Sequence, residues 1–310
     1  MLKMDENCFI CGAKNWKKLY EARDFLHDID GKFWLIECAN CGLVTSYPRL
    51  SMDQLEKFYP DDYMAFPVSI DEETEWHKRA DRQRGLNRRC SFACQASGKN
   101  TGTVLDVGSA TGIFLKGMQD RGWESYGIEP SSYAANYARE QLKLNVTQGY
   151  LEDGLFQADF FDLVTLWDVF EHIPNPVDVL ETIHKIIKPN GVLLITTPNS
   201  KSWDRYMFKE AWAGWDTPRH YYIYNQKSMV QLLNKHGFKF KRIKSFTNRH
   251  GSLVYSIRFW LKNKNASPRK RETIERILNS YLFRALTYPY FMFADAINRS
   301  ASMTVVFIKE

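Results

Sequence analysis

Long apolar segments are missing from this sequence. Its 310 residues contain no uninterrupted run of the ~18 apolar residues that a membrane-spanning helix requires. The first residues, MLKMDENCFICG, also lack the apolar core of a secretion signal. We therefore expect a cytoplasmic protein without a membrane span.

A strong charge of one sign is missing as well. The 42 Lys and Arg residues slightly outnumber the 36 Asp and Glu residues, which gives a formal net charge of +6. A net charge this small does not by itself indicate a nucleic acid or a membrane as partner. We therefore expect no nucleic-acid partner.

Cysteine is scarce, but four of the 6 cysteines form two C-x-x-C pairs that are each followed by glycine. Such spacing suits tetrahedral coordination of zinc by four thiolates, and a reducing cytoplasm disfavours disulfides. We expect a structural zinc site, with an iron–sulfur cluster or a redox pair as alternatives, and strands between the two pairs. The expected ligands are Cys8, Cys11, Cys38 and Cys41.

The glycine-rich segment lacks the third glycine of the dinucleotide fingerprint, because Ile113 stands at that position. Residues 103–129 nevertheless read as a strand, a glycine turn, a helix and a second strand that ends on Glu129. A carboxylate at that place can accept hydrogen bonds from ribose hydroxyls. This pattern predicts half of a nucleoside-binding α/β unit.

The D-x-G-x-x-x-G loop followed by an acid resembles motifs I and II of the class I S-adenosylmethionine-dependent methyltransferases. Three later segments are similar to later blocks of that family: FFDLVTLWDVFEHIPNP, KPNGVLLITTPN and RHYYIYNQKSMVQLLNKHGF. Together the blocks cover roughly residues 101–246 and the last strand. The resemblance implies an α/β fold with a Rossmann-like seven-stranded sheet, helices on both faces, and S-adenosylmethionine as cofactor.

The resemblance also implies which residues surround the cofactor. Asp106, Gly108 and Gly112 would lie at its methionine end, Glu129 at its ribose, and residues 149–151 at its adenine. Ala110 replaces a commoner glycine, which would stiffen the loop slightly. The expected cofactor-binding set is Asp106, Gly108, Ser109, Gly112, Glu129, Tyr150, Leu151, Trp167 and Asp168.

Candidate catalytic residues follow the strand predicted over residues 161–167. Ligands of open α/β sheets bind beyond the carboxyl ends of the strands. Methyl transfer to a hydroxyl needs alignment of the reactants and removal of a proton. We assign His172 as general base and Glu171 or Asp168 as its orienting partner or a substrate contact, with His220 as second candidate base. A Glu-His pair that only caps the next turn is the alternative.

Residues 202–220 contain three tryptophans that the sheet does not need, which predicts a cover over the acceptor site. Trp212 and Trp215 suit sugar or flat aromatic rings, and Arg219 suits a phosphate or carboxylate. Tryptophans that only pack the cover onto the domain fit the sequence equally well.

Three parts of the chain follow from these patterns: a zinc module over 1–54, an aromatic connector and helix over 55–100, and a methyltransferase domain over 101–310. Tyr59 and Tyr63 of the connector are candidates for contact with the pocket. A helix predicted over 70–89 begins acidic and ends basic, which complements its dipole and indicates a solvated face.

A helical insertion is expected over 248–301, between the last two strands. Arg284 and Pro289 argue against a membrane span in its aromatic-rich run, residues 280–296. A packed helical pair or a dimer face is expected there, with peripheral membrane contact as the alternative, so the protein would be a monomer or a dimer.

The four-cysteine module, the connector and the Glu-His pair together resemble methyltransferases of sugar and surface-polysaccharide biosynthesis. That resemblance implies methylation of a hydroxyl, rather than a carbon, of a small-molecule or glycan acceptor. The alternatives are an RNA methyltransferase with a zinc module, an O-methyltransferase of a quinone-type or other aromatic hydroxyl, and a binding protein that retains the cofactor site without catalysis.

Overall fold

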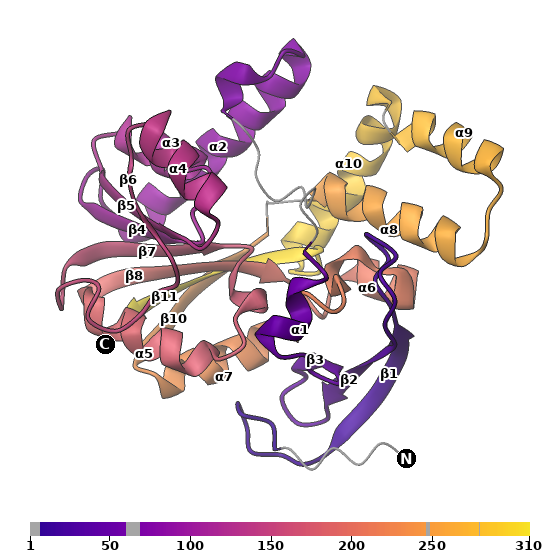
Figure 1. Ribbon diagram of the computed structural model, residues 1–310, viewed down its shortest axis with the longest axis horizontal. Helices are drawn as coiled ribbons and strands as arrows, with labels where there is room; N and C mark the ends of the chain where they lie inside the picture. Colours follow the sequence, from indigo (N-terminus) through magenta and orange to yellow (C-terminus); the bar gives the residue numbers. More distant parts are fainter. Residues whose placement is uncertain (1–6, 60–68, 246–248, 279) are drawn as a thin grey trace.

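The computed structural model describes residues 7–59, 69–245, 249–278 and 280–310. Its larger sheet has seven strands in the order β10-β11-β8-β7-β4-β5-β6 (Figure 1). Strand β11 is antiparallel to both of its neighbours, and the other pairs are parallel. The strands are β4 (Thr103–Val107), β5 (Glu124–Glu129), β6 (Asn145–Gln148), β7 (Phe161–Trp167), β8 (Ile187–Pro198), β10 (Phe238–Lys244) and β11 (Ser302–Lys309). The predicted Rossmann-like seven-stranded sheet is confirmed.

Helices cover both faces of this sheet, as predicted (Figure 1). All seven residues of the central strand β7 are buried, which explains its continuous apolar sequence. In helix α5, Leu180 and Ile183 face the sheet at helical spacing. One face carries α2 (Trp76–Ser97), α3 (Ile113–Gln119) and α4 (Ser132–Glu140), and the other carries α5 (Pro176–Ile186) and α7 (Gln226–Lys235).

Helix α2 differs from its predicted bounds of 70–89. It begins at Trp76 after Glu75 in extended conformation, and it ends before Gly98, whose φ of 71° stops the helix. The acidic residues therefore precede the helix instead of forming its first turn, and a short 3₁₀ turn, η1 (Ile70–Glu72), lies among them. The predicted bounds are wrong, whereas Glu75 at the N-cap still places an acid at the positive end of the helix dipole.

A second sheet of four antiparallel strands has the order β1-β2-β3-β9. Strands β1 (Trp16–Ala22) and β2 (Phe33–Cys38) are the strands expected between the two cysteine pairs, and β3 (Val44–Tyr47) precedes helix α1 (Met52–Glu56). The fourth strand, β9 (Tyr222–Ile223), comes from the segment that leads into α7. The N-terminal sheet therefore continues beyond the predicted boundary at residue 54.

One hydrophobic core joins the two sheets. It includes Ile10 and Leu35 of the N-terminal part together with Leu105, Phe161 and Ile195 of the larger sheet. The four-cysteine part is therefore packed as an integral piece of the molecule.

The segment between β10 and β11 is helical, as expected. It forms α8 (Arg249–Asn263), α9 (Pro268–Leu278) and α10 (Tyr281–Ala296), which lie together beyond the end of the sheet (Figure 1). Helix α6 (Trp203–Phe208) and the 3₁₀ turns η3 (Lys209–Ala211) and η4 (Ala213–Trp215) contact α8. Within the described ranges, no helix combines the length and apolarity needed to cross a membrane.

Candidate active site

The glycine turn after β4 needs its glycines for both conformation and space. Gly108 has a φ of 73°, and a Cβ atom there would lie 2.5 Å from Cγ2 of Val169. Gly112 has a φ of 80°, and its Cβ would lie 2.4 Å from Cδ1 of Leu144. Side chains other than hydrogen would therefore push the turn away from its neighbours.

The same turn is held against β5. The backbone amides of Gly108 and Ser109 both donate to the carbonyl of Ile128, at 2.8 and 3.0 Å. The carboxylate of Glu129 accepts hydrogen bonds from the amides of Ala110 and Ser131, at 2.8 and 2.9 Å. Each carboxylate oxygen keeps a further lone pair for a ribose hydroxyl. Burial raises the pKa of Glu129, and the two amides oppose that shift.

Asp106 lies in the interior of the sheet. Thr165 donates to its carboxylate at 2.6 Å, and burial raises the pKa of Asp106 to about 8 in spite of this bond. A cation bound nearby would favour the charged carboxylate. The sulfonium and ammonium groups of the expected cofactor are cations of this kind.

The remaining predicted cofactor residues differ in exposure. Ser109, Leu151 and Trp167 are buried, and Tyr150 is exposed. Trp167 packs edge to face on Phe114 with ring centroids 5.3 Å apart. Asp168 follows β7 with a φ of 58° and lies 3.7 Å from a guanidinium nitrogen of Arg89. Burial raises the pKa of Asp168, although Arg89 opposes the shift.

His172 lies in η2 (Phe170–His172), just beyond the carboxyl end of β7. Its Nδ1 is 3.1 Å from the carbonyl oxygen of Arg219 and 3.2 Å from the hydroxyl of Tyr59. Because a carbonyl can only accept, Nδ1 carries the proton and Nε2 keeps the lone pair. Burial and the neighbouring His220 lower the pKa of His172 to about 3. The imidazole is therefore neutral near pH 7, with the lone pair on Nε2.

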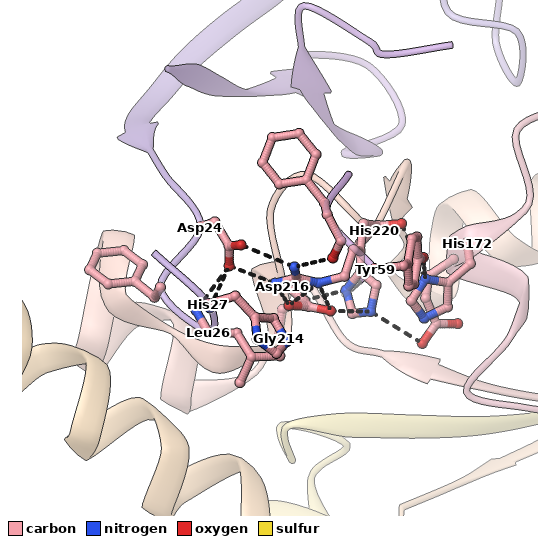
Figure 2. Close-up of polar contacts among 12 residues, drawn as sticks. Asp24, Leu26, His27, Tyr59, His172, Gly214, Asp216 and His220 are labelled. Carbon is pink, nitrogen blue, oxygen red and sulfur yellow. Dashed lines mark hydrogen bonds and ion pairs between the residues drawn. The ribbon is translucent and has the colours of Figure 1, made fainter. Parts of the chain in front are cut away.

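His220 lies against His172, with ring centroids 4.5 Å apart (Figure 2). Its Nδ1 donates to the carbonyl of Gly214 at 3.0 Å, which leaves the lone pair of Nε2 facing Glu171 Oε1 and Asp216 Oδ2, each at 4.0 Å. Burial lowers the pKa of His220, although Asp216 opposes the shift. The structure thus brings three of the predicted catalytic residues together.

Glu171 is almost completely buried. Burial, reinforced by Asp168, raises the pKa of Glu171 well above its ordinary range and favours the neutral acid. Glu171, His172 and His220 each offer one donor atom, all within 4.8 Å of one another, a spacing that could also hold a metal ion.

A buried ionic network supports this histidine pair (Figure 2). The side chain of Arg219 is 0% exposed and forms ion pairs with Asp24 at 2.7 Å and Asp216 at 2.6 Å. It also donates to the carbonyl of Phe58 at 2.9 Å. Burial disfavours the charge of Arg219, but Asp216 and Asp24 more than offset this and raise its pKa. Arg219 is thus occupied by protein carboxylates instead of facing an acceptor.

The two tryptophans predicted to face an acceptor are also part of the interior. Trp212 and Trp215 are 1% and 2% exposed and pack edge to face, with centroids 4.8 Å apart. Their burial agrees with the alternative that these tryptophans only pack the cover onto the domain, because neither ring has an exposed face. Of the two connector tyrosines, Tyr59 reaches the site, and Tyr63 lies outside the described residues.

Sequence reasoning missed Asp24 and Asp216. Asp216 lies three residues before Arg219, but a short spacing does not by itself indicate an ion pair. Asp24 lies far away along the chain, and no motif around it indicated a role.

The four paired cysteines converge as predicted. Cys8 and Cys41 have their sulfur atoms 3.6 Å apart, and Cys11 and Cys38 have theirs 3.5 Å apart. All four sulfur atoms lie within 4.8 Å of one another. Cys90, outside this cluster, is a packed thiol, since burial raises its pKa to about 12.

Comparison with known proteins identifies the family. Residues 76–242, more than half of the chain, match a family model described as a methyltransferase domain. The chain belongs to this methyltransferase family. Together with the relatives below, the match establishes an S-adenosylmethionine-dependent methyltransferase.

Curated relatives of this methyltransferase are named ubiquinone biosynthesis O-methyltransferase. The protein of Histophilus somni (strain 2336) is 34% identical over 121 residues, which are 35% of this chain and 51% of the relative. That of Pseudomonas paraeruginosa (strain DSM 24068 / PA7) is 32% identical over 117 residues, or 36% and 50% of the two chains. The chain spans about half the length of the curated relatives it matches.

A solved structure, of a candidate sarcosine dimethylglycine methyltransferase from Galdieria sulphuraria, has the same fold. Its TM-score is 0.51 at 15% identity, and the match covers 82% of this chain and 98% of the other. At this identity the likeness concerns the fold alone.

Replacing Gly108 by alanine should weaken binding of S-adenosylmethionine by about tenfold or more. An L-residue in the left-handed region costs about 1–2 kcal/mol, and ~1.4 kcal/mol corresponds to a factor of ten. The new Cβ would also meet Val169. Isothermal titration calorimetry measures the Kd. Gly85→Ala in α2 is the matched control, because nothing lies within 4 Å of its added Cβ. Equal affinities of the two variants would contradict the assignment.

Replacing Asp24 by asparagine should lower the free energy of unfolding by about 3 kcal/mol or more, because it leaves the buried charge of Arg219 partly uncompensated. The amide oxygen can still accept from the amides of Leu26 and His27, so the local turn is preserved. Urea unfolding measures the change. Asp28→Asn is the control, since the side chain of Asp28 is 56% exposed in its ion pair with Lys262. A loss for Asp24→Asn as small as the control's would show that the pair contributes little.

Proposed function

We propose that this methyltransferase transfers the methyl group of S-adenosylmethionine to an aromatic hydroxyl of a small quinol or catechol-type acceptor, with His172 as general base. The observation that carries the proposal is the tautomer of His172. Its Nδ1 is committed to the carbonyl of Arg219, so Nε2 is the atom that can take the hydroxyl proton.

The surroundings of His172 support this role. His220 and Glu171, both buried, lie beside it, and Tyr59 lies at Nδ1. Burial of the imidazole disfavours its protonated form before the reaction. As the sulfonium loses its positive charge during transfer, the hydroxyl loses its proton to Nε2, and no net charge has to be created in the site.

The acceptor class rests on the relatives. They are named for O-methylation in ubiquinone biosynthesis. These names support a quinone-type acceptor better than the glycan acceptor that we expected from the sequence. Burial of Trp212 and Trp215 removes the aromatic faces on which a sugar or a flat aromatic ring was expected to stack, so it does not distinguish the two acceptor classes.

We also propose that Cys8, Cys11, Cys38 and Cys41 hold one Zn²⁺ ion as thiolates. A tetrahedral site with Zn–S bonds of ~2.3 Å places its sulfur atoms about 3.8 Å apart, close to the separations within the two sulfur pairs. Such a closed site has no open position for substrate, so its role is structural. It would fasten the cysteine loops against Asn225, whose side-chain amide donates to the carbonyls of Cys41 and Gly42.

Incubation with methyl-labelled S-adenosylmethionine and a panel of catechols, hydroquinones and nucleotide sugars tests the acceptor class. We expect label in the dihydroxy aromatic compounds and none in the sugars. His172→Gln should lower kcat by about a hundredfold or more while the Kd for S-adenosylmethionine stays unchanged, because general-base assistance contributes about 10²–10⁴. Label in the sugars alone would refute the acceptor class.

Two controls sharpen the role of His172. His236→Gln changes a histidine that follows α7, outside this cluster, and should leave kcat unchanged. With a pKa of about 3, His172 stays unprotonated at all higher pH values. The pH profile of kcat/KM should therefore lack an acid limb near the ordinary histidine pKa of about 6.5. A limb there that disappears in His172→Gln would contradict the assigned protonation state.

Elemental analysis of the purified protein should give one zinc per chain, and Cys38→Ser should lose the metal and lower Tm by several degrees, because a thiolate ligand is removed. Cys94→Ser is the control, since Cys94 lies outside the four-cysteine cluster. A Cys38→Ser variant that retains the metal and the wild-type Tm would exclude the zinc site.

A further inference from the structure

Helix α10 exposes an uncovered apolar face. Six of its large apolar and aromatic side chains are between 48% and 70% exposed. At 100° per residue they occupy about half of the helix circumference, and both charged residues of the helix, Arg284 and Asp295, lie on the other half. The six are Tyr281, Leu282, Leu286, Tyr288, Met292 and Phe293, which we call the α10 face.

The opposite side of α10 fixes the helix to the molecule. Tyr290 donates a hydrogen bond to Asp204 of α6, and its ring lies 6.0 Å from that of Trp203. Phe291 and Ala294 are buried. The α10 face is therefore held in place on the side of the helix opposite to these contacts.

An exposed tryptophan of another element extends this face. Trp76, at the start of α2, is 78% exposed, and its ring lies 5.8 Å from that of His77. His77 in turn lies 6.2 Å from Tyr281, and Arg284 forms an ion pair with Asp81 of α2. The exposed aromatic surface thus spans α2 and α10.

Exposed cations lie on the segment that precedes α10 in the chain. Helix α9 directly precedes α10 and contacts it. Four exposed basic residues lie on α9 and on the turn before it, whereas the acids of α9, Glu272 and Glu275, pair with Arg276 and Arg258. The four basic residues are Lys264, Arg269, Lys270 and Arg271.

The combination of these features selects the partner. An apolar face with tyrosine and tryptophan, joined through α9 to a group of exposed cations, matches the interfacial zone of an anionic bilayer, where aromatic rings lie at headgroup depth and lysine and arginine contact lipid phosphates.

We propose that the α10 face and Trp76 dock this methyltransferase onto the surface of an anionic lipid bilayer. The apolar side chains enter the headgroup region, and the four basic residues contact the lipid phosphates. Docking itself does not depend on the proposed acceptor. If the proposed function holds, α10 connects the membrane to the acceptor side, because α6 begins the segment that contains Arg219 and His220.

Sedimentation of the whole protein with vesicles tests the proposal. We expect binding to vesicles of phosphatidylcholine with phosphatidylglycerol, much weaker binding to phosphatidylcholine alone, and loss of binding at high salt.

Leu286→Glu should weaken vesicle binding by at least about tenfold, because it places a negative charge in the apolar contact. Leu155→Glu, another exposed leucine far along the chain, should bind like the wild type. Lys270→Gln with Arg271→Gln should weaken binding to anionic vesicles only.

Three results would overturn the proposal: no binding to anionic vesicles, equal binding by Leu286→Glu and Leu155→Glu, or a dimer in sedimentation velocity that Leu286→Glu dissociates without any vesicle binding. Methylation of a water-soluble catechol should be unchanged in Leu286→Glu. That readout separates failure of docking from failure of the proposed function.

Discussion

The buried guanidinium of Arg219 is the constraint on which the arrangement of the site depends. Its charge is excluded from water and must be matched by protein groups, which come from three separate parts of the chain: Asp24, the carbonyl of Phe58, and Asp216. The backbone carbonyl of the same residue fixes the tautomer of His172. One arginine thus connects the N-terminal sheet, the connector and the imidazole to which we assign the base.

Shared packing reinforces this connection. Strand β9 completes the N-terminal sheet, and the residue that caps α7, Asn225, also binds the carbonyls beside Cys41. Trp212 and Trp215 belong to the hydrophobic core that joins the two sheets. The glycine turn and Glu129, which we expect at the cofactor, are by contrast held by the larger sheet alone. The protein therefore combines a glycine turn on the larger sheet with a histidine pair supported partly by the N-terminal sheet.

The sequence was informative wherever local physics determines structure. The central strand β7 is buried on both faces and so appears as an apolar run, and the glycines at 108 and 112 mark backbone that only glycine adopts easily. The pairing of Asp24 with Arg219 could not be predicted, since it joins residues 195 positions apart. The burial of Trp212 could not be predicted either, because an aromatic residue fits a hydrophobic core or a binding site equally well. The roles of His172 and of the four cysteines stay predictions.

The sharing of strand β9 has a consequence for how this protein can be divided. Residues 76–242 match the family model, but both sheets also contain strands from outside this range. Cutting the chain at those limits would remove β3, the partner strand of β9, together with Tyr20, against which Trp215 packs, and the carboxylate of Asp24. The range that matches the family model therefore differs from the range that folds as one structural unit. Exchanging the N-terminal part for that of another protein would require exchanging residues near 219 as well.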